Sequence, residues 1–224
     1  MRKTIIITAG GIGKRMGGQL PKQFLTIGEK PLLMHTILQF YRYDTSIQII
    51  LTLPEEWIGY WTELCGTNHF TVEHIVVKGG EERFHSIQNA LKQAEGELIG
   101  VHDGVRPFVS EQTIRTCFDT AFVKGNAIPV LSLKDSLRKV SENSSAAVLR
   151  SEYRIIQTPQ VFAAAVLREA YQQKFHEGIT DDATLVEALN IPIYLVEGNE
   201  ENIKITTRYD LQLADFLVSM HNQS

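Results

Sequence analysis

The sequence predicts an α/β protein in which helices flank a mostly parallel sheet and a β-arm projects from that sheet. Three observations support this prediction. Short β-branched runs alternate with amphipathic stretches along most of the chain, which is the pattern of a parallel α/β sheet. A glycine-rich loop follows the first apolar run, and the alternation stops in the region of residues 134–157. With 224 residues, the chain has the length of one large domain, residues 1–224, that includes the arm.

The predicted elements follow one another in a regular order. Buried strands are expected at residues 4–8, 47–53, 74–78, 98–102 and 127–133. Helices are expected near residues 31–41, 54–65, 83–93 and 111–123. Pro31 and Pro54 stand where prolines commonly open a helix, and Ser110 can cap the N-terminus of another.

The segment after residue 133 has a different pattern. Strand-like residues 137–140 and 147–149 flank a polar turn at 142–145, and no helix separates them, so we expect a projecting β-arm. A hairpin of this kind cannot bury both faces by itself, and a second subunit is the simplest partner for it. Helices at 163–174, 181–189 and 208–220 and a strand at 193–197 complete the prediction.

Composition excludes several classes of protein. The formal net charge of −4 and the pI near 6.0 provide no general attraction to nucleic acid or to an anionic membrane. We find no apolar segment long enough to span a bilayer. The two cysteines, Cys65 and Cys117, are far apart and lack metal-ligand spacing, which favours a reducing compartment. We therefore expect a soluble, cytoplasmic protein that binds small ligands.

The loop "TAGGIGKRMGGQLPKQF" at residues 8–24 is the first candidate binding site. Its glycines allow a ligand to approach the backbone closely, and its cations favour an anion. The third glycine of a dinucleotide fingerprint is missing after Gly11-Ile12-Gly13. A Walker loop is excluded because Arg15 follows the lysine where Ser or Thr is required. The remaining interpretations are a simple glycine-rich turn and a triphosphate site, and the cations favour the triphosphate site.

Ligands of parallel sheets collect beyond the carboxyl ends of the strands, and three further loops occupy such positions. "GGEERFHS" at residues 79–86 offers exposed backbone at a helix start, although a plain turn with a capping serine explains it equally well. "VHDGVRPF" places Asp103 at a strand end, where it suits a divalent cation or a substrate hydroxyl, or pairs with Arg106 to stabilise a turn. Lys204 in "NIKIT" points into the cleft or is solvated.

Taken together and in order, these motifs resemble a known enzyme family. "AGGIGKRMG", "PKQF", "GGEERFHSI", "VHDGVRPF", "QTPQVF", "TDDATLVE" and "NIKIT" resemble the cytidylyltransferases that make CDP-linked polyols, in particular those acting on 2-C-methyl-D-erythritol 4-phosphate in the non-mevalonate route to isoprenoid precursors. The resemblance implies a Rossmann-like nucleotidyltransferase sheet. It also implies a reaction of CTP with a polyol phosphate, with release of pyrophosphate, that uses Mg²⁺. It further implies a homodimer that exchanges its β-arms.

The resemblance assigns roles to particular residues. The nucleotide would be bound by Ala9, Gly10, Gly11 and Gly13, with Gly80, Glu81 and Ser86 recognising cytosine. The catalytic cations at the phosphates would be Arg15, Lys22 and Lys204. Asp103 and Arg106 would lie near the metal and the polyol, with Asp103 as metal ligand. The partner's arm would bind the polyol phosphate through Ser136, Arg150 and Thr158. Leu149 departs from the family pattern, in which an aspartate often precedes the arm arginine.

The implied chemistry needs no side-chain nucleophile, because the phosphate oxygen of the substrate is already anionic. The protein has to bring two anions together and stabilise the charge of the transition state. His102 then has little to do as a general base and is interpreted as structural. Two alternatives remain open: a ribitol 5-phosphate (pentitol phosphate) cytidylyltransferase, and a CTP-binding sensor without turnover.

Overall fold

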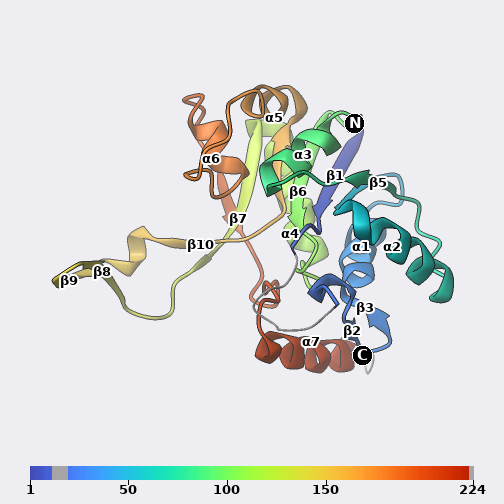
Figure 1. The fold of residues 1–224 in the computed structure, drawn as a ribbon. Helices are drawn as coiled ribbons and strands as arrows, with labels where there is room; N and C mark the ends of the chain where they lie inside the picture. Colours follow the sequence, from blue (N-terminus) through green and yellow to red (C-terminus); the bar gives the residue numbers. More distant parts are fainter. Residues whose placement is uncertain (12–19, 222–224) are drawn as a thin grey trace.

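The computed structural model describes residues 1–11 and 20–221, and its centre is an eight-stranded sheet (Figure 1). The strand order is β10-β7-β11-β6-β1-β4-β5, and β12 also pairs with β7. The strands are β1 (Lys3–Thr8), β4 (Gln48–Leu53), β5 (Ile75–Lys78), β6 (Leu98–Asp103), β7 (Asn126–Ser132), β10 (Arg154–Ile156), β11 (Gln160–Ala163) and β12 (Leu195–Glu197).

The sheet is mostly parallel, which confirms the predicted fold class. β1 pairs in parallel with β4 and β6, β4 with β5, and β12 with β7. β11 lies antiparallel between β6 and β7, and β10 lies antiparallel to β7. The sequence analysis missed β11 and assigned residues 154–156 to the arm, because strands this short carry no periodic signal of their own. β5 was expected to be buried, but it forms a sheet edge with partly exposed side chains.

Helices cover both faces of the sheet, so its central strands are apolar on both sides. α1 (Leu32–Tyr43), α2 (Glu55–Thr67) and α4 (Glu111–Lys124) pack on one face, where Ile5 and Ile7 of β1 are buried. α3 (Arg83–Leu91), α5 (Ala164–Ala170) and α6 (Asp182–Glu187) pack on the other, which buries Ile6. The alternation along β1 therefore determines which side chains face α3.

Several helix boundaries follow directly from local chemistry. Ser110 caps α4 by accepting a hydrogen bond from the backbone N–H of Thr113, as expected. Gly125 ends the same helix in the left-handed conformation, with φ of 90°. Pro31 and Pro54 occupy the N-cap positions of α1 and α2, one residue earlier than the expected first helical position.

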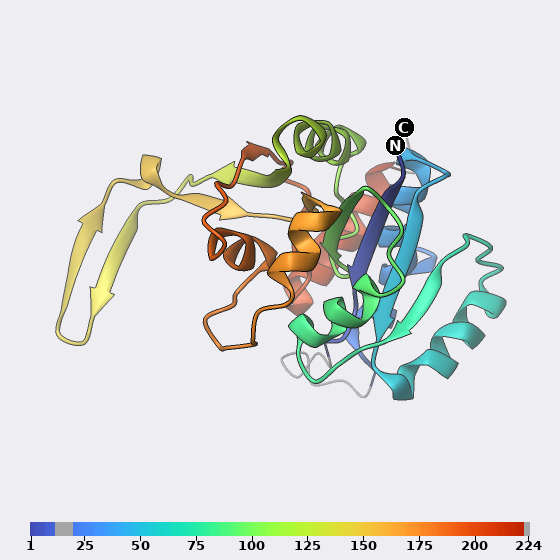
Figure 2. The same cartoon turned by 90° about the horizontal axis from the view of Figure 1, so that it is seen from above.

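The arm is a separate hairpin of β8 (Leu137–Ser141) and β9 (Ser144–Val148), followed by the 3₁₀ turn η3 (Arg150–Glu152). Figure 2 shows it reaching away from the sheet and its helices, which confirms the predicted projection. Val140 is 76% exposed and Leu149 is 68% exposed, so the arm leaves apolar side chains uncovered within its own chain.

A second small region closes the bottom of the molecule in Figure 1. The 3₁₀ turn η2 (Lys22–Phe24) leads into the hairpin of β2 (Thr26–Ile27) and β3 (Lys30–Pro31), and α7 (Arg208–His221) packs against this hairpin. None of the helices in the described parts of the chain combines the length and apolarity that a bilayer crossing requires.

Candidate active site

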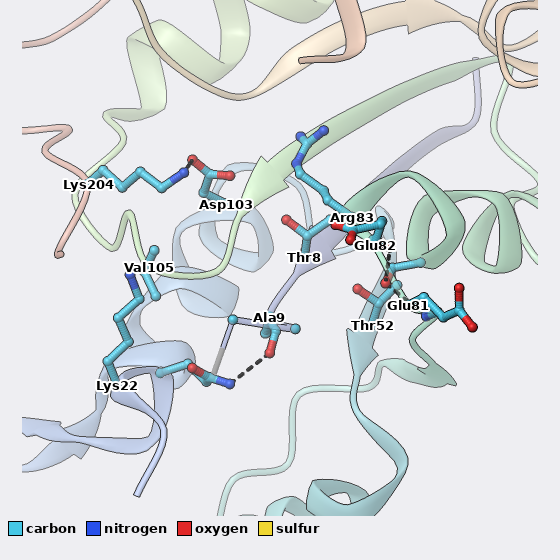
Figure 3. A pocket seen from close by; sticks show the side chains of 15 residues that line it. Thr8, Ala9, Lys22, Thr52, Glu81, Glu82, Arg83, Asp103, Val105 and Lys204 are labelled. Atoms are coloured by element: carbon cyan, nitrogen blue, oxygen red, sulfur yellow. Dashed lines mark hydrogen bonds and ion pairs between the residues drawn. The ribbon is translucent and has the colours of Figure 1, made fainter. Parts of the chain in front are cut away.

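A cavity of about 350 Å³ lies at the carboxyl ends of β1, β4 and β6 (Figure 3). Its lining comes from the glycine-rich loop, the β5–α3 loop, the ends of the strands and the segment before α7. The lining residues are Thr8, Ala9, Gly10, Gly11, Lys22, Gln23, Thr52, Gly80, Glu81, Glu82, Arg83, Ser86, Asp103, Val105 and Lys204. The cavity therefore lies beyond the strand ends, where the site is expected.

Three side chains in register form one wall of the cavity. Thr8 at the end of β1 pairs with Thr52 of β4 on one side and with Asp103 of β6 on the other. All three point to the face covered by α3, as do Ile6 and Ile50 two residues earlier. Since neighbouring strands are about 4.8 Å apart, the row from Thr52 to Asp103 spans about 10 Å. This row has an acidic end at Asp103 and a neutral end at Thr52.

The acidic end holds a cluster of opposite charges. Asp103 is only 8% exposed, and its Oδ2 forms an ion pair with Nζ of Lys204 at 3.1 Å and accepts a hydrogen bond from Nε of Arg106 at 3.0 Å. Burial raises the pKa of Asp103, but the nearby Lys204, Arg83 and Arg106 lower it more, so the net pKa lies well below the usual range. Asp103 is therefore ionised and holds the Lys204 ammonium group at the cavity.

Arg106 lies behind Asp103 and is not part of the cavity lining. Besides Asp103, it donates through Nη1 to the backbone carbonyl of Asn202 at 2.8 Å. It thereby joins the end of β6 to the segment that carries Lys204. The expected place of Arg106 beside the polyol stays a prediction.

A buried polar network supports Asp103 from beneath. The Thr158 hydroxyl lies 2.9 Å from Nδ1 of His102 and accepts from the Asp103 N–H at 3.1 Å. Nε2 of His102 lies 3.0 Å from the carbonyl oxygen of Arg106, which fits a neutral ring with its proton on Nε2. Thr158 is 7% exposed and packs within its own chain, so the expectation that it lies on the arm is wrong. The reason is that the chain has already returned to the main sheet at β10.

Burial lowers the pKa of His102 from 6.5 to about 4, so its ring is neutral near pH 7, as a structural role requires. The unfolded chain takes up this proton below pH 6.5, whereas the folded chain does so only near pH 4. Folding stability should therefore fall as the pH drops through this window, by about 3 kcal/mol from this group alone.

We expect His102→Gln to reduce the loss of melting temperature between pH 6.5 and pH 4. Thermal unfolding across this range measures the slope, and His176→Gln, at an exposed histidine, serves as the matched control that keeps the wild-type slope. A His102→Gln slope equal to that of wild type would show that this ring does not titrate as described.

The β5–α3 loop forms the Thr52 end of the cavity, where it adds two acidic side chains, Glu81 and Glu82, to the lining. The Gly80 N–H donates to Oγ of Ser86 at 3.0 Å, and this hydroxyl donates to the carbonyl oxygen of Glu82 at 3.1 Å. A Cβ on Gly80 would lie 2.3 Å from Cβ of His85, so a glycine is required here. Ser86 thus shapes the turn, while Glu81 is exposed at the edge of the cavity.

The glycine-rich loop leaves β1 beside the same cavity. The Ala9 N–H donates to the carbonyl oxygen of Thr52 at 3.1 Å, and the Ala9 carbonyl accepts from Nε2 of Gln23 at 2.7 Å. Lys22, next to Gln23, lines the cavity on the same side as Lys204 in Figure 3. The remaining two predicted loop residues, Gly13 and Arg15, lie outside the described residues.

Several lining residues had no assigned role in the sequence analysis. Arg83 makes two hydrogen bonds to the fully buried Asp182, at 3.0 and 2.7 Å, and Tyr171 donates to the same carboxylate. Burial lowers the pKa of Arg83, but Asp182 raises it more, so the net pKa is raised. The sequence signal for this pair was the "TDD" motif. Gln23 lies in the "PKQF" motif, whereas Thr52 carried no signal, because its place in the cavity depends on strand pairing.

Ser136 and Arg150 are not brought together with these residues. Both are exposed, neither lines the cavity of its own chain, and Arg150 donates to the backbone carbonyl of Lys134. The arm therefore adds neither residue to the lining of its own cavity.

The carboxylate of Asp103 is the candidate ligand for Mg²⁺ at this cavity. Within residues 1–11 and 20–221, no three His, Cys, Asp or Glu side chains are grouped to hold a metal ion. Mg²⁺ commonly keeps several waters and uses one or two carboxylates together with substrate phosphates. An ionised Asp103 at the cavity fits an arrangement in which the protein supplies one carboxylate and the nucleotide supplies phosphate ligands.

A mostly parallel sheet with a glycine-rich strand-end loop and cations around one buried aspartate defines an α/β nucleotidyltransferase. The family model for 2-C-methyl-D-erythritol 4-phosphate cytidylyltransferase matches residues 3–220, and the chain belongs to this family. The Bacteroides thetaiotaomicron enzyme of this name is 51% identical over 220 residues, which cover 97% of this chain and 100% of that protein. The Bacteroides fragilis enzyme is 50% identical, covering the same shares.

Solved structures of this family have the same fold. The crystal structure of 2-C-methyl-D-erythritol 4-phosphate cytidylyltransferase from Thermus thermophilus is 31% identical, with a TM-score of 0.80, over 98% of this chain and 100% of that chain. The synthase from Anaerococcus prevotii is 26% identical, with a TM-score of 0.83, over 97% of this chain and 96% of that chain. The resemblance stated from the motifs is confirmed.

Proposed function

We propose that this protein transfers CMP from CTP to 2-C-methyl-D-erythritol 4-phosphate and releases pyrophosphate, a step of isoprenoid precursor biosynthesis by the non-mevalonate pathway. The observation that carries the proposal is the cavity over Thr52, Thr8 and Asp103, with cations at one end and a backbone turn at the other. Family membership makes CTP and this polyol phosphate the substrates to test.

The nucleotide lies along the row in this proposal. Its base lies at the neutral end, beside Gly80, Glu81 and Ser86, and its ribose and triphosphate follow Ala9, Gly10 and Gly11 toward the cations. Backbone groups and a fixed turn recognise the polar edge of a pyrimidine, and a purine is rejected by its size and by hydrogen bonds left unpaired. Family resemblance adds Gly13 and Arg15 to the phosphate side.

The reaction is an in-line displacement at phosphorus. An anionic phosphate oxygen of the polyol phosphate forms a bond to the α-phosphorus of CTP. The bond from this phosphorus to the oxygen that bridges it to the β-phosphate breaks, and pyrophosphate leaves with the electron pair. Lys22, Lys204 and Arg15 hold the two anions together and stabilise the charge of the transition state. Asp103 keeps Lys204 in place, and Arg106 and Thr158 position Asp103.

A magnesium ion bound with CTP is part of the proposal, with Asp103 as its protein ligand. When bound, it neutralises charge on the phosphates. Asp103 has one carboxylate oxygen, Oδ2, paired with Lys204 and Arg106, so Oδ1 is the atom we assign to the metal.

A homodimer with exchanged arms completes the proposed site. Ser136 and Arg150 are not among the residues that line the cavity of their own chain, and we assign them to the polyol phosphate of the partner. The exposed Val140 and Leu149 support a partner surface on the arm. The free, widely separated Cys65 and Cys117 support a cytoplasmic location.

Pyrophosphate release with CTP and a panel of polyol phosphates tests the proposal. We expect turnover with 2-C-methyl-D-erythritol 4-phosphate. Turnover with ribitol 5-phosphate alone would identify a pentitol phosphate enzyme instead. Binding of CTP without turnover on any polyol phosphate would identify a nucleotide sensor.

The same assay tests the nucleotide site. Because the Gly80 turn is rigid and close to the row, we expect kcat/KM with CTP to exceed that with ATP or GTP by a large margin. Equal turnover with ATP would contradict the assignment of Gly80, Glu81 and Ser86 to the base.

A further inference from the structure

Thr52 has an unusual environment within the cavity wall. Its side chain is fully buried, it lines the cavity, and among residues 1–11 and 20–221 its hydroxyl has no hydrogen-bond partner. Buried hydroxyl groups are nearly always paired, because an unpaired one has lost its hydrogen bonds to water without replacing them. The Thr52 hydroxyl therefore destabilises the unliganded fold.

Two other threonines on the same sheet face, the buried Thr4 and the partly buried Thr8, are paired. Oγ1 of Thr4 donates to Gln48 at 2.6 Å and accepts from the Gly96 N–H at 2.8 Å. Oγ1 of Thr8 donates to the carbonyl oxygen of His102 at 3.3 Å. Thr8 lines the same cavity and its hydroxyl is paired, so Thr52 is the exception in this row.

The position of Thr52 indicates which part of a ligand it meets. It lies about two strand spacings, or about 10 Å, from Asp103, which is about the separation between the base and the phosphates of a nucleotide. Figure 3 shows Thr52 with Glu81 on the side of the cavity away from Lys204 and Asp103. Ser86, the other hydroxyl at this end, already bonds to Gly80 and Glu82.

We propose that the Thr52 hydroxyl binds the polar edge of the pyrimidine ring of CTP and is a further determinant of nucleotide affinity. This inference rests on the proposed function. A threonine hydroxyl can both donate and accept, so it matches the amino group, the ring nitrogen or the carbonyl oxygen of cytosine. Ligand binding then satisfies a group that the unliganded fold leaves unpaired.

The test compares Thr52→Val with Thr4→Val. Thr4→Val makes the same change near the start of β1, away from the strand ends that form the cavity. Thr52→Val keeps the shape and removes the hydroxyl, so the melting temperature of the unliganded protein should equal or exceed that of wild type. The KM for CTP should rise roughly three- to tenfold, the usual effect of one hydrogen bond, while the KM for the polyol phosphate stays unchanged. Thr52→Ser should retain the wild-type KM for CTP.

Thr4→Val should behave in the opposite way. Its loss leaves the buried Gly96 N–H without its partner, so the melting temperature should fall and the KM for CTP should not change. An unchanged KM for CTP in Thr52→Val overturns the inference. So does a fall in melting temperature matching that of Thr4→Val, because the hydroxyl would then have a partner in the unliganded fold.

Failure of the proposed function would appear in the wild-type protein rather than in the variant. It would show as no release of pyrophosphate from CTP and no rise in melting temperature when CTP is added. If the wild-type protein responds to CTP and Thr52→Val has the same KM for CTP as the wild type, only the role of Thr52 is overturned.

Discussion

Lys22→Ala is expected to lower kcat by about 10²- to 10³-fold, the usual effect of removing one preorganised group that stabilises transition-state charge. The melting temperature should stay at the wild-type value, because Lys22 is only partly buried and lies on the short turn η2. Steady-state pyrophosphate release and thermal unfolding measure the two quantities on the same preparation.

Lys92→Ala is the matched control for this experiment. Lys92 is exposed and contacts Asn89 on α3, outside the cavity lining, so both its kcat and its melting temperature should stay at wild-type values. If Lys22→Ala keeps full turnover, Lys22 is not one of the cations at the phosphates. If it unfolds, its loss of activity says nothing about the transition state, and its main role is structural.

Mixed dimers are expected to recover activity that each parent lacks. If Lys22 and Arg150 of one site come from different chains, both Lys22→Ala and Arg150→Ala homodimers should be nearly inactive. A heterodimer with one chain of each kind then has one site with both defects and one site with neither. Its activity per dimer should be about half that of wild type, by the twofold symmetry of such an assembly.

Coexpression with two different affinity tags, followed by purification through both, yields the mixed dimer. The control is a wild-type chain paired with a chain that carries both substitutions. With shared sites, each site of this control has one defect, so it should be nearly inactive. The reverse result, an active control and an inactive mixed dimer, would place Arg150 in the site of its own chain.

Local patterns in the sequence predicted most of the fold. The β-branched runs, the amphipathic stretches and the Ser110 cap depend on residues close together in the chain, so they can be found without knowledge of the tertiary structure. The projecting hairpin followed from the polar turn at 142–145. The glycine-rich loop, Lys22, Asp103 and Lys204 were found because they follow strands whose carboxyl ends share one edge of a sheet.

Strand pairing determined the positions of residues that the local patterns could not place. The insertion of β11 between β6 and β7 placed Thr158 beneath Asp103 instead of on the arm. Arg106 donates to Asp103 and to the backbone carbonyl of Asn202, far along the chain, a contact that no local pattern indicated.

The row of Thr52, Thr8 and Asp103 separates what the sequence determines from what the tertiary structure determines. The sequence by itself determined that Thr8, Thr52 and Asp103 lie at or next to the ends of predicted strands, since this follows from the order of residues along the chain. Only the tertiary structure decided that the three lie in register on the face covered by α3, with one hydroxyl left unpaired. Register depends on hydrogen bonds between segments more than forty residues apart, as between Thr8 and Thr52, and a one-residue shift would turn each side chain to the opposite face.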